Sequence, residues 1–355
     1  ADDRGQIIRN ADPKAVVSHL TRALDLPVSS YYRTGDKGLL PIMKELVDKN
    51  RALLGKPDKL HDMGHRASGF CRLWDVAEEW PIWTDQDRLE ITNALLHDAM
   101  LGHERRAMHQ QVLEGAVQCM DENHGTSSAL CSYEAWKYFH KYYRLPQSEY
   151  WMKVAAACFS GVSSTFQINE DASGYLVYTP EYAASYAVQS KDLRYFESGI
   201  AYDQARYVAL ACMNNLGLET GFGDSASIIN PSNFQFLSRV AWYCRDPRLY
   251  WVLLNAVPRA CGLRIFQNDL VLDLDVPTQE PTDWTGMLLM PIYEMPVAKG
   301  QARKEPVFAP KRAIPGIFNK IVFKENWSPE GQYLLLDGAG VWGDAPGPHG
   351  HRHSD

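Results

Sequence analysis

The stretch Asn319–Gly340, NKIVFKENWSPEGQYLLLDGAG, contains two short apolar runs separated by polar residues and a glycine. We interpret the first run, NKIVFKEN, as a half-buried strand. The second run, QYLLLD, is typical of a short apolar strand that follows a turn. The spacing therefore predicts two β-strands near the end of this 355-residue chain.

Upstream of these strands, residues 12–259 are typical of one helix after another. A predicted helix begins after Thr84, whose side chain can cap the first turn together with Asp87. Short breaks rich in Gly, Pro and Asn or Asp separate the helical segments, which favours antiparallel helical hairpins. Apolar residues recur at helical spacing, and one stripe in SYEAWKYFHKYY comprises Tyr133, Trp136, Phe139 and Tyr143.

The composition changes near Pro281, where proline and glycine become frequent. We therefore expect a helical domain over residues 1–280, a linker over 281–310, and the first strands of a β domain over 311–355. The last segment holds too few strands for a sandwich of about 100 residues. We expect a continuation beyond Asp355, or a separate C-terminal segment, to complete the β domain.

The overall charge and hydropathy exclude two classes of partner. The chain has 36 Lys+Arg against 43 Asp+Glu, a formal net charge of −7, whereas nucleic-acid binders need clustered basic residues. The longest apolar stretches, such as VAAACFSGV from Val154, are shorter than the ~20 residues that a membrane-spanning helix requires. The seven cysteines are scattered without a CxxC pair, and we expect them to be buried apolar residues.

Two motifs within the helical region combine chemistry-bearing side chains with a helix boundary. In DENHGTSS, we expect Asn123 and His124 at the C-terminal end of a helix just before Gly125, where they can also serve only as a helix cap. The segment NEDASGYLVYTPEY is predicted to be a break between helices. Its tyrosines, which can pack, stack on carbohydrate or act as catalysts, are Tyr175, Tyr178 and Tyr182.

A third motif, GPHGHRHSD, places His349, His351 and His353 at alternate positions. On a strand, alternate residues point to the same face, so the three imidazoles can converge. Such a cluster suits a metal ion or an anionic substrate. The structural alternative is a histidine-bearing terminus without a defined fold.

Taken in this order, the three motifs resemble those of the heparinase II/III-like polysaccharide lyases. The likeness is carried by NHG at Asn123–Gly125, by GFGDS at Gly221–Ser225, and by the sequence from Ile321, through the predicted strands, to the final HGHRHSD. The resemblance implies a mainly α protein in which an incomplete (α/α) toroid of helical hairpins is followed by an antiparallel β-sandwich, with the substrate cleft between them. It also implies a periplasmic or secreted bacterial protein.

The activity that this resemblance implies is β-elimination at a uronic acid residue of an acidic polysaccharide. In that family a side chain neutralises the carboxylate, a base removes the C5 proton, and an acid protonates the departing 4-oxygen. The resemblance assigns Asn123 and His124 to neutralisation and His351 to a further base or substrate anchor. It assigns Tyr178 to proton transfer as base, acid or both, because Tyr178 follows His124 by 54 residues, close to the family spacing.

Further residues are implied as substrate or metal contacts. Tyr182 and then Tyr175 are the next candidates for the tyrosine role, and both are otherwise expected to bind substrate. Arg239 in FLSRVAWY adds a guanidinium for a carboxylate or sulfate. His353 matches a residue that ligates a structural zinc in some members, while catalysis itself requires no cofactor.

Three other functions stay open at this stage. Uronate C5 epimerisation needs the same residues, and only its product differs. A glycoside hydrolase requires two carboxylates across the scissile bond. No pairing is evident among the candidates Asp98, Glu104, Asp121 and Glu122. A non-catalytic glycan-binding domain is the third alternative.

Overall fold

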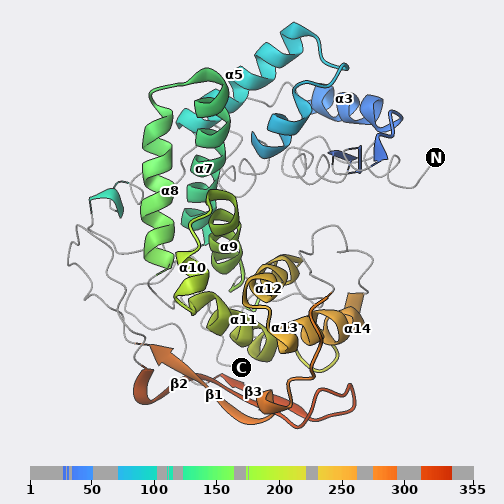
Figure 1. Ribbon diagram of the computed structural model, residues 1–355, viewed down its shortest axis with the longest axis vertical. Coiled ribbons are helices and arrows are strands. Elements are labelled where there is room, and N and C mark those ends of the chain that lie inside the picture. The colour runs from blue at the N-terminus through green and yellow to red at the C-terminus, as the bar shows by residue number, and fades with distance from the viewer. Residues whose placement is uncertain are drawn as a thin grey trace. The chain divides into compact units, whose positions relative to one another are not determined.

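A computed structural model describes residues 27–28, 30–31, 34–50, 71–101, 110, 112–114, 123–163, 173–174, 176–220, 231–261, 275–293 and 313–337. In these residues the protein is mainly helical, with a small three-stranded antiparallel sheet (Figure 1). The chain divides into two compact units, the first comprising residues 1–113 and 127–156 and the second residues 114–126 and 157–355. Within the described residues we find no helix with the length and apolar character needed to cross a membrane.

The first unit is built from helices around an aromatic core. It contains α3 (Leu39–Asn50), the helical residues 71–77, α5 (Asp85–Leu101), and parts of α7 (Asn123–Tyr143) and α8 (Ser148–Val162). The large side chains buried in this core include Met43, Trp74, Tyr138, Phe139 and Trp151. Burying rings of this size supplies much of the apolar area that stabilises a helical unit.

The predicted cap at the start of α5 is confirmed. The Thr84 backbone N–H donates to Asp87 Oδ2 at 2.9 Å, and the Asp87 N–H donates to Thr84 Oγ1 at 3.1 Å. The predicted stripe on α7 is confirmed only in part, because Tyr133 and Phe139 are buried whereas Tyr143 is 46% exposed. Its place inside is taken by Tyr138, whose hydroxyl donates to Glu78 Oε2 at 2.7 Å.

In the second unit, three helices pack against one another: α9 (Tyr178–Ser190), α11 (Ile200–Ala211) and α12 (Pro231–Cys244). A row of alanines on α11, at positions 201, 205 and 209, is fully buried and permits close approach of its neighbours. The shorter elements are α10 (Arg194–Glu197), α13 (Pro247–Trp251), a π-helical turn (Val252–Ala256), α14 (Pro258–Cys261) and a 3-10 turn (Thr282–Trp284).

The sheet has the order β1-β2-β3, with β1 (Gly286–Tyr293), β2 (Ala313–Lys324) and β3 (Tyr333–Asp337). Both predicted strands are present as β2 and β3. However, β1 lies inside the segment 281–310 that we expected as a linker. Prolines flank and interrupt this strand, and the register shifts at Pro291. Because proline is unusual in strands other than edge strands, the sequence pattern did not identify β1.

The two faces of the sheet reverse the usual distribution of polarity. On one face Lys320, Val322 and Lys324 are fully buried. On the opposite face, paired across the three strands, lie Met287, Phe323 and Leu334, and then Leu289, Ile321 and Leu336. Met287 is 72% exposed, and the two leucines of β3 are also exposed. We call these six residues the outer apolar face.

Candidate functional site

The motif NHG lies at the beginning of a helix and not at the end of one. Asn123 is the first residue of α7 and His124 the second, and Gly125 continues the helix. The expectation of a C-terminal cap was therefore wrong. The polar residues that follow do not end the helix, because the Thr126 hydroxyl donates to the Asn123 carbonyl at 3.2 Å.

The tyrosine segment also differs from its prediction. Tyr178 is the first residue of α9 and Tyr182 lies one turn further on, so both belong to a helix and not to a break. Their rings stack with centroids 6.1 Å apart and planes inclined by 14°. Both side chains are half-buried, whereas Asn123 is only 1% exposed. The paired phenols are thus the accessible part of this region.

A hydrogen bond brings the two motifs together. Thr126 Oγ1 and Thr179 Oγ1 lie 3.1 Å apart, which joins the first turn of α7 to the first turn of α9. Thr126 lies three residues after Asn123, and Thr179 directly follows Tyr178. Two helix N-termini therefore meet beside the predicted neutralising residues and the predicted catalytic tyrosine. In α9 the first turn already carries the acidic side chain of Glu181, which the N-terminal end of a helix favours.

Arg239 is engaged by a residue that the sequence analysis missed. It lies on α12, and its Nη1 donates to both carboxylate oxygens of Glu181 in the first turn of α9. The Arg239 side chain is 16% exposed and that of Glu181 is 7% exposed. Because we expected a break between helices over this segment, Glu181 could not be recognised from the sequence as a first-turn acidic residue.

Other predicted site residues lie outside the described part of the chain. They are Tyr175, Gly221–Ser225, His349, His351 and His353. Of the four carboxylates considered for a hydrolase, Asp98 lies in α5 and the other three are outside the described residues. Among the described residues no group of three or more His, Cys, Asp or Glu side chains is placed to hold a metal ion.

The described cysteines fit the expected structural role. Cys71, Cys158 and Cys212 are buried, and Cys131 and Cys244 are partly buried. All five are free thiols. Burial, followed by the negative charge of Asp246, raises the pKa of the Cys244 thiol to about 11. A thiolate nucleophile at Cys244 is therefore disfavoured at neutral pH.

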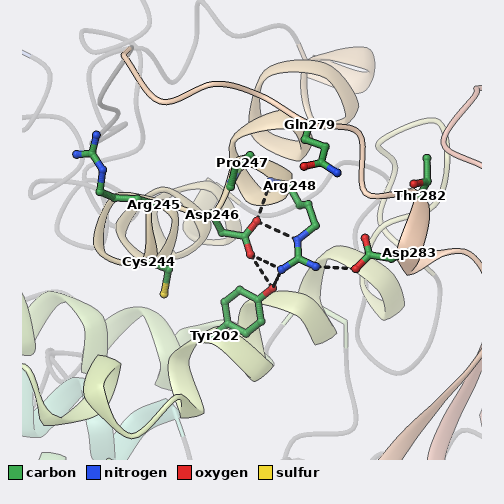
Figure 2. A pocket seen from close by; sticks show the side chains of 9 residues that line it. All are labelled: Tyr202, Cys244, Arg245, Asp246, Pro247, Arg248, Gln279, Thr282 and Asp283. Carbon is green, nitrogen blue, oxygen red and sulfur yellow. Dashed lines mark hydrogen bonds and ion pairs between the residues drawn. The ribbon is translucent and has the colours of Figure 1, made fainter.

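A polar pocket of about 560 Å³ lies elsewhere in the second unit (Figure 2). Its floor is a network in which Arg248 donates to Asp246, to the Tyr202 hydroxyl at 2.7 Å and to Asp283 at 2.6 Å. Burial opposes ionisation of Asp246, but hydrogen bonds from Arg248 and Tyr202 hold its pKa below the ordinary value. Asp246 also caps α13, and Arg248 lies over the Trp284 ring. We therefore interpret the network as chiefly structural.

Compared with known proteins, the sequence matches no family model and no curated protein. The chemistry must be judged from the geometry. The start of α7 carries the buried amide of Asn123, and the start of α9 carries the two stacked, half-buried phenols of Tyr178 and Tyr182.

Proposed function

We propose that the protein is a polysaccharide lyase that cleaves an acidic, uronate-containing polysaccharide by β-elimination. The observation that carries this proposal is the hydrogen bond between Thr126 and Thr179. It joins the helix start that bears Asn123 and His124 to the helix start that bears Tyr178. These are the residues that the resemblance to the heparinase II/III-like lyases assigns to the reaction, and they are distant in sequence.

The proposed chemistry begins with the substrate carboxylate at the start of α7. By the resemblance, Asn123 and His124 would stabilise the charge that develops there when C5 is deprotonated. Tyr178 would take the C5 proton and return a proton to the departing O4. The C5–H and C4–O4 bonds break, and a C4=C5 double bond forms.

Neighbouring groups extend the proposal to substrate binding. The stacked pair of Tyr178 and Tyr182 presents a half-exposed aromatic surface, which suits the apolar face of a sugar ring. We assign His351 to a second proton-transfer or anchoring role and His353 to a structural zinc, both by resemblance. The substrate is accordingly an acidic polysaccharide or oligosaccharide, in a periplasmic or secreted setting.

The architecture implied by the same resemblance is also part of the proposal. The helical hairpins would belong to an incomplete (α/α) toroid. The sheet would be one layer of an antiparallel β-sandwich, and its outer apolar face supports this because a second layer would bury those six side chains.

The test is ultraviolet absorbance of the conjugated double bond during incubation with alginate, glucuronan, ulvan and glycosaminoglycans. We expect one polymer to produce the signal, and we expect Tyr178→Phe and His124→Ala to lose at least about 99% of the rate. Tyr142→Phe, a change at an exposed tyrosine of the first unit, is the matched control and should retain full activity. If the wild-type protein produced no absorbance change with any of these polymers, the proposal would be contradicted.

The alternatives give different outcomes in the same experiment. An epimerase would exchange the C5 proton with solvent deuterium and produce no double bond. A glycan-binding domain would bind a polymer without turnover, and its affinity would not change in Tyr178→Phe.

A further inference from the structure

We infer that Glu181 is a positioning residue for Tyr178 and that Arg239 acts through Glu181, and not as an anchor for the substrate carboxylate. This inference rests on the proposed function, since it concerns how the tyrosine is held for the reaction. It differs from the role expected for Arg239 from the sequence, which was direct binding of a carboxylate or sulfate.

Glu181 belongs to the same helical turn as Tyr178. Its backbone N–H donates to the Val177 carbonyl at 2.8 Å, which closes the first turn of α9 around Tyr178. Its side chain extends to α12 and accepts from Arg239 Nη1 with both oxygens. The ion pair therefore connects the turn that carries the tyrosine to the middle of a neighbouring helix.

The burial of Glu181 makes its ion pair with Arg239 important for stability. Both side chains are largely buried, and a buried carboxylate that loses its cation is strongly destabilised. Burial, and after it the negative charge of Glu181, raises the pKa of the buried Tyr195 well above its ordinary value. The Tyr195 hydroxyl donates to Gln204 within the same interior. Glu181 is thus a negative charge in a region of low polarity, with Arg239 as its cation.

The same facts argue against Arg239 as a substrate anchor. A substrate carboxylate that took Arg239 would have to displace the largely buried Glu181 carboxylate from this ion pair. Arg239 instead holds the Glu181 side chain in one orientation.

The first test measures kcat and KM on the polymer that the absorbance assay identifies. Glu181→Gln and Arg239→Met should each lower kcat about 10- to 100-fold with KM within about twofold, because small displacements of a reacting group reduce rates by such factors. The double variant should be no slower than the slower single variant, and Arg239→Lys should recover part of kcat. Arg194→Met, which removes a more exposed ion pair with Asp192 in the same unit, is the control.

Two kinetic results would overturn the inference. One is an Arg239→Met variant whose KM rises about tenfold or more with an unchanged kcat, which would identify Arg239 as an anchor. The other is an unchanged kcat in both single variants.

A second measurement does not need a substrate. Amide hydrogen exchange at residues 178–182 should be about tenfold faster in Glu181→Gln than in the wild-type protein, while residues 200–211 of α11 keep their rates. Unchanged exchange at 178–182, or an equal increase in α11, would show that Glu181 does not position this turn. If the wild-type protein were inactive on every polymer, the proposed reaction would fail while this measurement still decided the positioning role.

Discussion

At the scale of single residues, Lys324 is the most unusual titratable group in the sheet. It is fully buried on the inner face, where its Nζ donates to Asn215 Oδ1 at 2.5 Å and lies 4.2 Å from the centre of the Trp327 ring. Burial, and then the nearby charge of Arg259, lowers the pKa of Lys324 to about 7. The folded protein therefore releases this proton far more easily than the unfolded chain, whose lysines titrate near pH 10.4.

This shift predicts how stability depends on pH. Between pH 7 and about pH 10.4 the unfolded chain holds a proton that the folded protein has lost, so Lys324 destabilises the fold increasingly as the pH falls toward 7. We expect the free energy of unfolding of the wild-type protein to rise by about 2 kcal/mol from pH 7 to pH 9, relative to Lys324→Met.

Urea unfolding of both proteins at the two pH values measures this difference. Comparison with the variant removes the contributions of other groups, such as Tyr333 and Cys212, whose pKa values are raised chiefly by burial. If the free energy of unfolding changed equally in the two proteins between pH 7 and pH 9, Lys324 would not be the group responsible.

At the scale of the elements, a side-chain hydrogen bond joins the starts of α7 and α9. Thr179→Val keeps the shape of the side chain but removes the hydroxyl that bonds to Thr126. We expect a loss of about 1 kcal/mol in the free energy of unfolding. A double-mutant cycle with Thr126→Val measures the coupling directly, and strictly additive effects would mean that the hydrogen bond does not join the helices.

The outer apolar face of the sheet gives a second prediction at this scale. Leu289 and Leu336 pair with Ile321 from either side and are exposed. Leu289→Lys and Leu336→Lys should reduce the fluorescence of a bound hydrophobic dye, with changes of no more than about 0.5 kcal/mol in the free energy of unfolding of this chain. Val322→Ala, on the buried face, should instead destabilise the fold by about 1 kcal/mol. If neither lysine substitution changed the fluorescence of the bound dye, the accessible apolar surface would lie elsewhere.

At the scale of the whole molecule, the charge of the chain and the proposed substrate have the same sign. A formal net charge of −7 repels an acidic polymer at long range. The repulsion of distant charges is screened by salt. The proposed function therefore requires a local positive field around the bound polymer that outweighs the overall charge.

Some features of the protein were determined by local sequence alone. The β-branched and aromatic run IVF in NKIVFKEN and the run YLLLD indicate β2 and β3, and the pair Thr84 and Asp87 indicates the start of α5. These signals are strong because strand periodicity and reciprocal capping involve residues only a few positions apart. The expectation of a mainly helical chain followed by a small antiparallel sheet is confirmed for the same reason.

The tertiary structure alone decided the rest. It placed residues 127–156 with the N-terminal unit and residues 114–126 with the C-terminal one. The sequence pattern had instead predicted one helical domain over residues 1–280. It also paired Glu181 with Arg239 and Thr126 with Thr179, partners that lie 58 and 53 positions apart. Such pairings arise from packing of helix faces, and the energy of a buried ion pair or hydrogen bond depends on surroundings that no short window of sequence records.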